Sequence, residues 1–264
     1  MSQLDKHFIF NGACSEEYNI ICGFVGGKVD DFFSAGSHTD LQTESNFNGS
    51  VYHIISNKYS EPISFNMEIV HKNGGKLNRE ELRSIITWLC NPIDYMPLQI
   101  KDAFYENIIY YAKFTNPEEL FVNGVNGLRV KCTCKHPYGF TNLIKKKYTI
   151  NNSTTAFTVP VNSDENDYIY PEFFKITFNS DCDLFVLKNL NDIQLSQLEI
   201  KNVKSGEFFD FNCQDKFINS PSNNVLERFN KKWPRLLNGK NKIIVNTNCV
   251  IEIGFREIRK VGLR

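Results

Sequence analysis

A single amphipathic helix, expected within residues 76–100, constrains the fold of this chain more than any other stretch. Asn78 is placed to cap its first turn, and Glu81 stands three residues later, where its carboxylate completes a capping box. Asn91-Pro92 ends the helix, because proline disfavours helical geometry in the residue before it. Leu82, Ile85, Ile86 and Leu89 recur at helical spacing and form one apolar stripe. Trp88 lies near the edge of this stripe. A lone helix with one apolar stripe, flanked by strand-like sequence, is expected to cover a sheet.

The sequence around this helix predicts β-strands. Ile63, Phe65, Met67 and Ile69 alternate with polar residues, as in a strand with one buried face. Further strand candidates before residue 141 are 7–12, 18–25, 96–100, 107–115 and 120–134, the last containing two expected Asn-Gly turns. Strands on both sides of one helix predict an α+β, mostly β fold with an antiparallel N-terminal sheet.

Residues 28–60 stand out because they are polar and carry weak strand signals, around 29–33 and 50–54. Such a segment has too little apolar surface to form a core of its own. We therefore expect an extended β-arm that gains stability against a partner, and a surface loop is the alternative.

A second domain is expected after a polar stretch at 141–155. This boundary divides the chain into an N-terminal domain, 1–141, and a β-sandwich, 142–247. Short strand candidates recur beyond it, as in antiparallel sandwiches. They are 156–160, 173–178, 184–187, 197–200, 207–211, 242–245 and 249–255.

Composition excludes several classes of protein. The 264 residues contain 30 Lys plus Arg and 30 Asp plus Glu, so no global charge excess favours nucleic acid as a partner. The first residues lack a secretory h-region, and no apolar run has the length of a membrane span. Eight cysteines without a C-x-x-C pair predict reduced thiols in a soluble protein made in the cytosol.

Candidate metal sites are weak. Cys132, Cys134 and His136 alternate on one strand face and offer zinc ligands, but no fourth ligand is near in sequence. The acidic run at 163–168 lacks the glycine and the final glutamate of a calcium loop, since Ile169 and Lys175 stand there. Its carboxylates are Asp164, Glu165 and Asp167. Core thiols and a solvated turn are the favoured interpretations, so we expect no metal and no cofactor.

No catalytic site is predicted. The chain lacks G-x-S-x-G, a P-loop and H-E-x-x-H, which leans away from an enzyme. Its histidines are scattered, and Asp30-Asp31 would serve hydrolysis only with partners from elsewhere. The histidines are His7, His38, His53, His71 and His136. Two short basic clusters are more typical of solvated faces or interface rims than of a phosphate-binding site. They consist of Lys145, Lys146 and Lys147, and of Arg256, Arg259, Lys260 and Arg264.

The sandwich half supports an alternative function, a carbohydrate-binding β-sandwich module for attachment to a host surface. Sugar sites need exposed aromatic faces, which Trp233 with Tyr168 or Tyr170 would supply. A cell-wall hydrolase is a third hypothesis and would need a paired acid and base in a cleft.

Four segments together resemble the distal tail protein (Dit) family of long non-contractile phage tails. They are HFIFNGACSEEYNIICGFV, LNREELRSIITWLCNPIDYMPLQI, IIYYAKFTN through LFVNGVNGLRVKCTCKHPYGF, and ERFNKKWPRLLNGKNKIIV. Their order and spacing span nearly the whole chain. His136, which precedes Pro137, departs from the family pattern, and 28–60 does not align residue by residue.

The resemblance implies a structural baseplate hub at the virion tail tip, assembled in the host cytoplasm. Family members form a homo-hexameric ring that joins the tail tube protein to the tail-tip or tail-associated protein, with DNA only passing through the lumen. A receptor-binding protein is a further implied partner. The resemblance also implies a galectin-like sandwich, a β-arm that reaches the next subunit, and a last strand within 248–264 that returns to the N-terminal domain.

Overall fold

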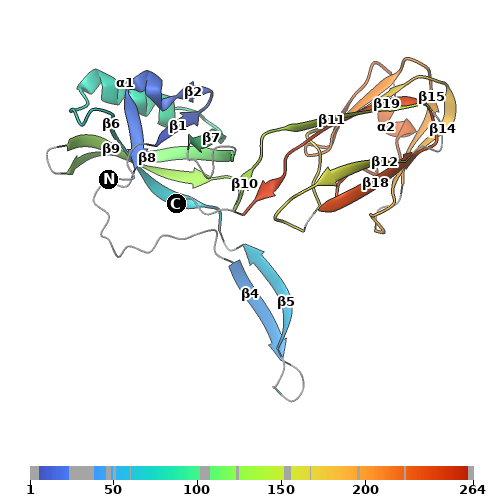
Figure 1. The fold of residues 1–264 in the computed structure, drawn as a ribbon, viewed down its shortest axis with the longest axis horizontal. Helices are drawn as coiled ribbons and strands as arrows, with labels where there is room; N and C mark the ends of the chain where they lie inside the picture. Colours follow the sequence, from blue (N-terminus) through green and yellow to red (C-terminus); the bar gives the residue numbers. More distant parts are fainter. Residues whose placement is uncertain are drawn as a thin grey trace. The chain divides into compact units, whose positions relative to one another are not determined.

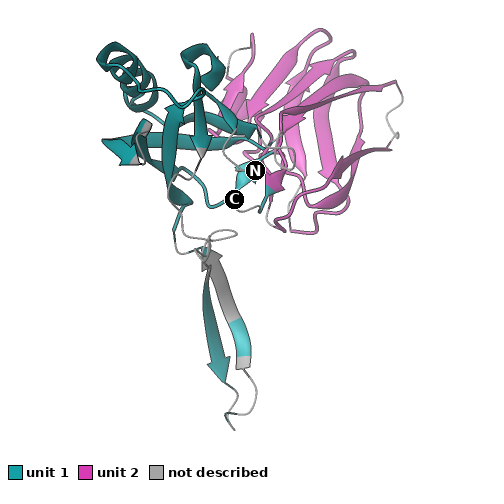
Figure 2. Cartoon of the chain, turned by 60° about the vertical axis from the view of Figure 1, so that its left-hand side comes forward, with its two compact units in different colours: residues 1–140, 259–264 teal, residues 141–258 magenta. Residues whose placement is uncertain are grey.

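The computed structural model divides the chain into two compact units (Figure 2). Unit 1 comprises Met1–Phe140 and Arg259–Arg264, and unit 2 comprises Thr141–Ile258. The structure describes residues 6–23, 39–45, 49, 52–59, 61–101, 108–122, 125–151, 156–166, 168–194, 197–222 and 224–260. Because the chain enters unit 2 once and leaves it once, unit 2 is an insertion in unit 1.

Unit 1 is built on a seven-stranded antiparallel sheet with the order β2-β1-β7-β8-β9-β6-β3 (Figure 1). Its strands are β1 (His7–Phe10), β2 (Ala13–Cys14), β3 (Ile20–Gly23), β6 (Ser64–His71), β7 (Met96–Lys101), β8 (Tyr110–Val122) and β9 (Val125–Cys134). A 3-10 helix, η1 (Ser15–Tyr18), connects β2 to β3. A bridge between Lys6, the residue before β1, and Cys22 of β3 brings the edge strand β3 beside β1, so the sheet is strongly curved.

Helix α1 (Arg79–Cys90) confirms the predicted helix and its cap. The Asn78 side chain accepts from the amides of Glu80 and Glu81 at 2.9 Å, and the Asn78 amide donates to the Glu81 carboxylate at 2.8 Å. Leu82, Ile85 and Leu89 are buried in the core of unit 1. Helix α1 therefore covers the sheet as its apolar stripe predicted.

Trp88 ties α1 to the first strand and to η1. Its ring is stacked between Phe8, at 5.4 Å between centroids, and Tyr18, at 4.4 Å. Its indole nitrogen donates to the Phe10 carbonyl at 3.1 Å. The indole nitrogen of this half-buried tryptophan thus has a hydrogen-bond partner, and two aromatic rings stack on the indole.

One predicted turn of unit 1 is wrong. Asn126-Gly127 lies inside β9, paired with β6 and β8, and not at a hairpin turn. A Cβ atom at Gly127 would lie 2.5 Å from the Ile69 carbonyl oxygen. Glycine stands there because the backbones of β9 and β6 approach closely, a requirement that sequence alone does not separate from turn chemistry.

Unit 2 is a sandwich of a five-stranded and a four-stranded antiparallel sheet, with the orders β11-β19-β13-β16-β17 and β12-β18-β14-β15. The first sheet contains β11 (Ile144–Ile150), β13 (Phe173–Phe178), β16 (Phe208–Asn212), β17 (Phe217–Asn219) and β19 (Cys249–Phe255). The second contains β12 (Ala156–Val161), β14 (Cys182–Asn189), β15 (Leu198–Val203) and β18 (Gly239–Val245). A short helix, α2 (Val225–Arg228), precedes Phe229, and two short strands, β10 (Gly139–Phe140) and β20 (Ile258–Arg259), lie at the two passages between units.

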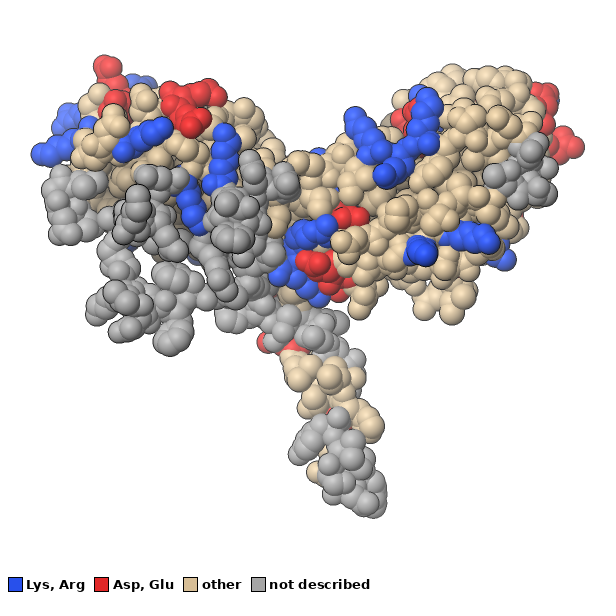
Figure 3. All heavy atoms as spheres, in the orientation of Figure 1, with Lys and Arg blue, Asp and Glu red and all other residues tan. Residues whose placement is uncertain are grey.

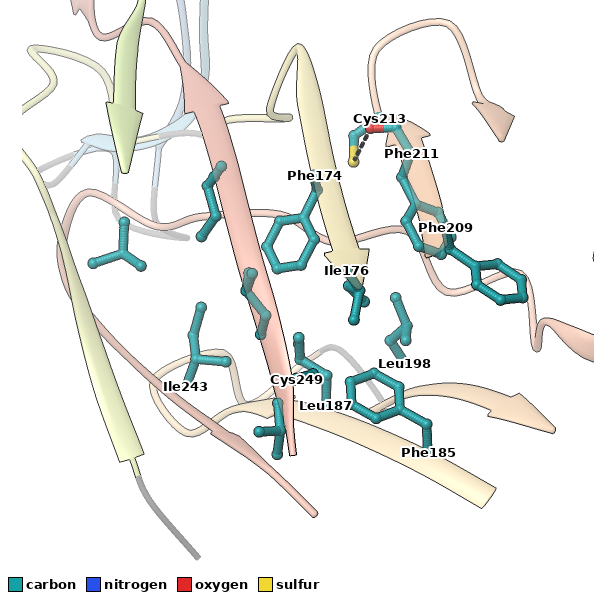
Figure 4. Close-up of a cluster of buried hydrophobic side chains, with 14 of the residues drawn as sticks. Phe174, Ile176, Phe185, Leu187, Leu198, Phe209, Phe211, Cys213, Ile243 and Cys249 are labelled. Carbon is teal, nitrogen blue, oxygen red and sulfur yellow. Dashed lines mark hydrogen bonds between the residues drawn. The ribbon is translucent and has the colours of Figure 1, made fainter. Parts of the chain in front are cut away.

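Alternating apolar residues from both sheets fill the sandwich core (Figure 4). Phe174 and Ile176 from β13 face Phe185 and Leu187 from β14 in this cluster. Along each strand, every second side chain points into the interior, and this alternation within the strand is the pattern visible in the sequence.

Two expectations about unit 2 differ from the structure. Residues 144–150, read from their polarity as part of a linker, form the edge strand β11, where lysines meet water. Most of the stretch 248–264, from which one strand was expected to return to the N-terminal domain, is β19, which lies between β11 and β13 in unit 2, and the short strand β20 pairs with β10. Every second residue of β19 faces the sandwich core, and only residues from 259 onward belong to unit 1.

An ion pair on unit 2 yields a pH prediction. Arg228 donates to both carboxylate oxygens of Glu207, at 2.6 and 2.8 Å, and lowers the pKa of Glu207 from 4.5 to about 2 despite partial burial. Because the pKa of Glu207 is lower in the folded than in the unfolded chain, its ionised carboxylate stabilises the fold at pH values above the unfolded-state pKa. That contribution is lost as the pH falls from about 4.5 toward 2. We expect the stability difference between wild type and Glu207→Gln, measured by urea unfolding, to shrink over this window. An unchanged difference would contradict this assignment.

Candidate functional site

The candidate site is the hairpin formed by β4 (Thr39–Ser45) and β5 (Tyr52–Tyr59) (Figure 1). These strands form a two-stranded sheet, and within the described residues neither has a second strand beside it. An isolated two-stranded hairpin is marginally stable in water at best. The predicted β-arm within 28–60 therefore contains a hairpin whose outer strand edges have no strand partner in the described chain.

The register gives the hairpin one apolar and one polar face. Thr43 lies directly opposite Ile54, so Ile54 shares a face with Thr43 and, by alternation, with Leu41. The opposite face carries charged and polar side chains: Asp40, Gln42, Glu44 and His53. A bulge after Gln42 shifts the register by one residue and thereby places Ile54 on the face of Leu41.

The apolar face is open. Leu41 is 57% exposed and Ile54 is 66% exposed, although both are large aliphatic residues. Sequence reasoning did not single out either residue, since β4 has only one apolar residue and the bulge leaves no pattern in the sequence. Two exposed aliphatic side chains on one face of a marginally stable hairpin make this face the candidate contact surface for another protein. Residues 28–38, including Asp30, Asp31 and His38, lie outside the described residues.

The predicted thiol and imidazole cluster is divided between two environments. Cys132 and Cys134 are buried in the core of unit 1, and burial raises the pKa of the Cys132 thiol well above its usual value. His136 instead packs against Tyr138 and Phe140, and burial with nearby Lys135 lowers its pKa. A buried thiol with a raised pKa, such as that of Cys132, is a poor metal ligand. No group of three His, Cys, Asp or Glu side chains suited to a metal ion occurs in the part of the chain that the structure describes.

The other ionisable candidates have local structural contacts. Lys147 pairs with Glu252 at 2.7 Å, and Arg256 pairs with Glu172 while donating to the Thr141 carbonyl. His7 approaches Glu16 at 3.3 Å, and His71 accepts from the amide of Asn73 in the turn after β6. On the face shown in Figure 3, basic and acidic side chains are interspersed. Asp167 and Arg264 lie outside the described residues.

The aromatic residues of the carbohydrate hypothesis already have partners. The guanidinium of Arg235 lies 3.5 Å from the ring centroid of Tyr168, and the ammonium of Lys216 lies 3.8 Å from that of Tyr170. Trp233 packs edge-on against Phe211 and Phe229 at the sandwich core. A sugar would need an open ring face, and a cation covers one face of each tyrosine. This geometry does not favour a sugar site built on these three rings.

The sequence matches two family models, a phage tail protein N-terminal domain over residues 4–136 and a phage tail C-terminal domain over residues 138–255. The chain belongs to this family of phage tail proteins. It is 25% identical over 261 residues to the SPbeta prophage-derived uncharacterized protein YomH of Bacillus subtilis (strain 168), covering 97% of this chain and 98% of that protein.

The fold is that of a distal tail protein. The crystal structure of SPP1 Dit (gp 19.1) covers 95% of this chain and 98% of its own, with a TM-score of 0.69 at 10% sequence identity. SPP1 Dit is a paradigm of the hub adsorption apparatus in phages that infect Gram-positive bacteria. The resemblance in sequence and the mostly β fold with one long helix and an arm are thereby confirmed. Among the described helices, none is long and apolar enough to cross a membrane.

Proposed function

We propose that this tail protein is a distal tail hub subunit, which forms a homo-hexameric ring at the tail tip. The ring joins the tail tube protein to the tail-tip or tail-associated protein and offers a site for a receptor-binding protein. Its work is positioning and involves no catalysis. Support comes from the family match over both domains and from the Dit-like fold. A formal net charge of zero suits a conduit that DNA crosses without being retained.

The observation that carries the proposal is the β4–β5 hairpin. It exposes an apolar face and two strand edges, and both would be covered by docking on a neighbouring copy. A ring closes when one such heterologous contact repeats through a rotation that returns to the first subunit.

The described edges of the sandwich are less suited to strand pairing. Edge strand β11 carries Lys145, Lys146 and Lys147, and edge strand β12 carries Pro160. Edge strand β15 is bridged by Phe229 at Ile200, and β17 has only three residues. Proteins prevent edge-to-edge association of sheets with charged side chains or proline on the edge strand, with a segment that covers the edge, or with a very short edge strand. By register, the face of the hairpin that carries Leu41 and Ile54 has no charged residue, which is why we assign self-association to it.

Self-association is testable by light scattering coupled to size-exclusion chromatography and by negative-stain imaging. We expect wild type to form a discrete hexamer and rings. The double variant Leu41→Glu with Ile54→Glu should remain monomeric, because charges would replace the apolar contacts. Circular dichroism should show both units still folded, since these side chains are exposed.

A matched control changes the opposite face by the same number of acidic groups, with Gln42→Glu and His53→Glu. It should assemble like wild type, which separates the apolar face from a general charge effect. A wild-type protein that stays monomeric at all concentrations would refute the ring. Equal disruption by both double variants would remove the apolar face from the interface.

A further inference from the structure

The base of the hairpin is attached to unit 1 at two points. The ring of Tyr59, the last residue of β5, packs edge-on against Tyr138 with 6.0 Å between centroids. Four residues later, the Ile63 carbonyl accepts from the Cys134 amide at 2.8 Å. Tyr59 and Ile63 are therefore both held against the segment 134–138. Pro62 lies between these points and restricts the backbone there.

Tyr138 is itself held by surrounding rings. It is stacked on His136 at 5.7 Å and lies edge-on to Phe140 at 5.4 Å. Phe140 packs against Tyr111 of β8, and its amide and carbonyl are both bonded to Ile109. These contacts join the Tyr138 ring to the main sheet of unit 1, so it is a firm support for Tyr59.

The returning chain reaches the same place. The ammonium of Lys260 lies 5.6 Å from the centroid of the Tyr59 ring. We call Tyr59, Tyr111, His136, Tyr138, Phe140 and Lys260 the aromatic clamp. It brings together the hairpin base, the segment before residue 141 and the segment after residue 258, where the chain passes between the units.

We infer that the aromatic clamp positions the β4–β5 hairpin, with Tyr138 as the principal positioning residue. Apart from Tyr59, the hairpin side chains that the structure describes are exposed, and the contacts given above join the hairpin to the sheet at its base. This inference rests on the proposed docking of the hairpin on a neighbouring copy. A hairpin already held in one direction loses less conformational freedom on docking and therefore binds more tightly.

The decisive experiment compares Tyr138→Ala with Tyr138→Phe in the full chain. Amide relaxation by nuclear magnetic resonance, at a dilution where the protein is monomeric, reports whether the hairpin moves with unit 1. We expect order parameters in β4 and β5 to fall in Tyr138→Ala and to stay at the wild-type level in Tyr138→Phe, which keeps the ring. Sedimentation should show association about three- to tenfold weaker for Tyr138→Ala alone, the factor that loss of an aromatic contact implies.

Two outcomes separate this inference from the ring proposal. If wild type never associates but Tyr138→Ala still loosens the hairpin, the ring fails and the clamp stands. If hairpin order parameters are the same in wild type and Tyr138→Ala, the clamp is refuted even when rings form. Should Tyr138→Ala unfold unit 1, Tyr59→Ala gives the same test from the hairpin side, where the fold of the sheet is not at stake.

Discussion

Replacing Asn241 with leucine is expected to lower the free energy of unfolding of unit 2 by about 3 kcal/mol or more. Asn241 in β18 is fully buried and makes four hydrogen bonds. Its amide donates to the carbonyls of Val159 and Leu237, at 3.2 and 2.8 Å. Its oxygen accepts from the Leu237 amide and from Asn189, each at 2.8 Å. Leucine has a similar volume but can form none of these four hydrogen bonds, so each of the four partner groups loses its bond to residue 241.

The position of these bonds explains the size of the effect. They connect β18 to its neighbour β12 and to the turn before it, which also carries Arg235. Arg235 in turn is paired with Asp192, whose side chain is only 2% exposed. A buried polar group that loses its partner cannot form a replacement hydrogen bond with water. Each broken bond therefore costs most of the free energy of desolvating that group.

The matched control is Asn246→Leu, the same substitution at an exposed position. Asn246 also bonds through its side chain, to Val186, Leu184 and the hydroxyl of Thr247, but water can replace these bonds at an exposed position. Thermal unfolding followed by circular dichroism should show the unit 2 midpoint fall by roughly 10 °C or more for Asn241→Leu and by much less for the control. Equal shifts in the two variants would show that burial of the network is not the cause.

The parts of the fold that the sequence predicted are those governed by local physics. The α1 cap depends on Asn78 and Glu81, three residues apart, and the periodic stripe behind them identifies the buried face. In unit 2, strands such as β13 and β19 are short runs rich in β-branched and aromatic residues that bury alternate side chains, so each can be recognised from its own sequence. Residues that contribute to a core leave a pattern in their own neighbourhood.

What the sequence did not predict depends on pairing between distant residues. β11 looks like a linker because an edge strand tolerates three consecutive lysines, and only its pairing with β19 makes it a strand. β4 has a single apolar residue, Leu41, and its role depends on the bulge that aligns it with Ile54. The aromatic clamp joins residues 59, 138 and 260, and no local pattern connects them.

The candidate site follows the same division. The composition of 28–60 indicated a segment that cannot be stable alone, because that conclusion needs only a lack of apolar residues. Identifying the face of the hairpin that another copy would cover required the pairing register of β4 and β5. Family resemblance supplied the expectation of a ring, whereas the hairpin supplies the residues with which that expectation is tested.

Replacing Gly127 with alanine is expected to destabilise unit 1 by about 3 kcal/mol, because overpacking here has no easy relief. Gly127 in β9 lies between β8 and β6, opposite Val70. The added Cβ would stand 2.5 Å from the Ile69 carbonyl oxygen and 2.9 Å from a Val70 methyl group. A side chain can rotate away, but the carbonyl belongs to the backbone of β6, so the two strands would have to separate.

Gly75→Ala is the matched control within the same unit. A Cβ at Gly75 would meet only the His71 ring, at 3.6 Å, which is an ordinary contact. We expect this control to melt like wild type or slightly higher, since alanine restricts the unfolded chain. Hydrogen exchange of peptides from β6 and β9 should rise in Gly127→Ala while peptides from β13 and β19 keep their protection, because unit 2 has its own core. If Gly127→Ala exchanges like wild type, the strands can separate at little cost, and close backbone packing is not what requires glycine there.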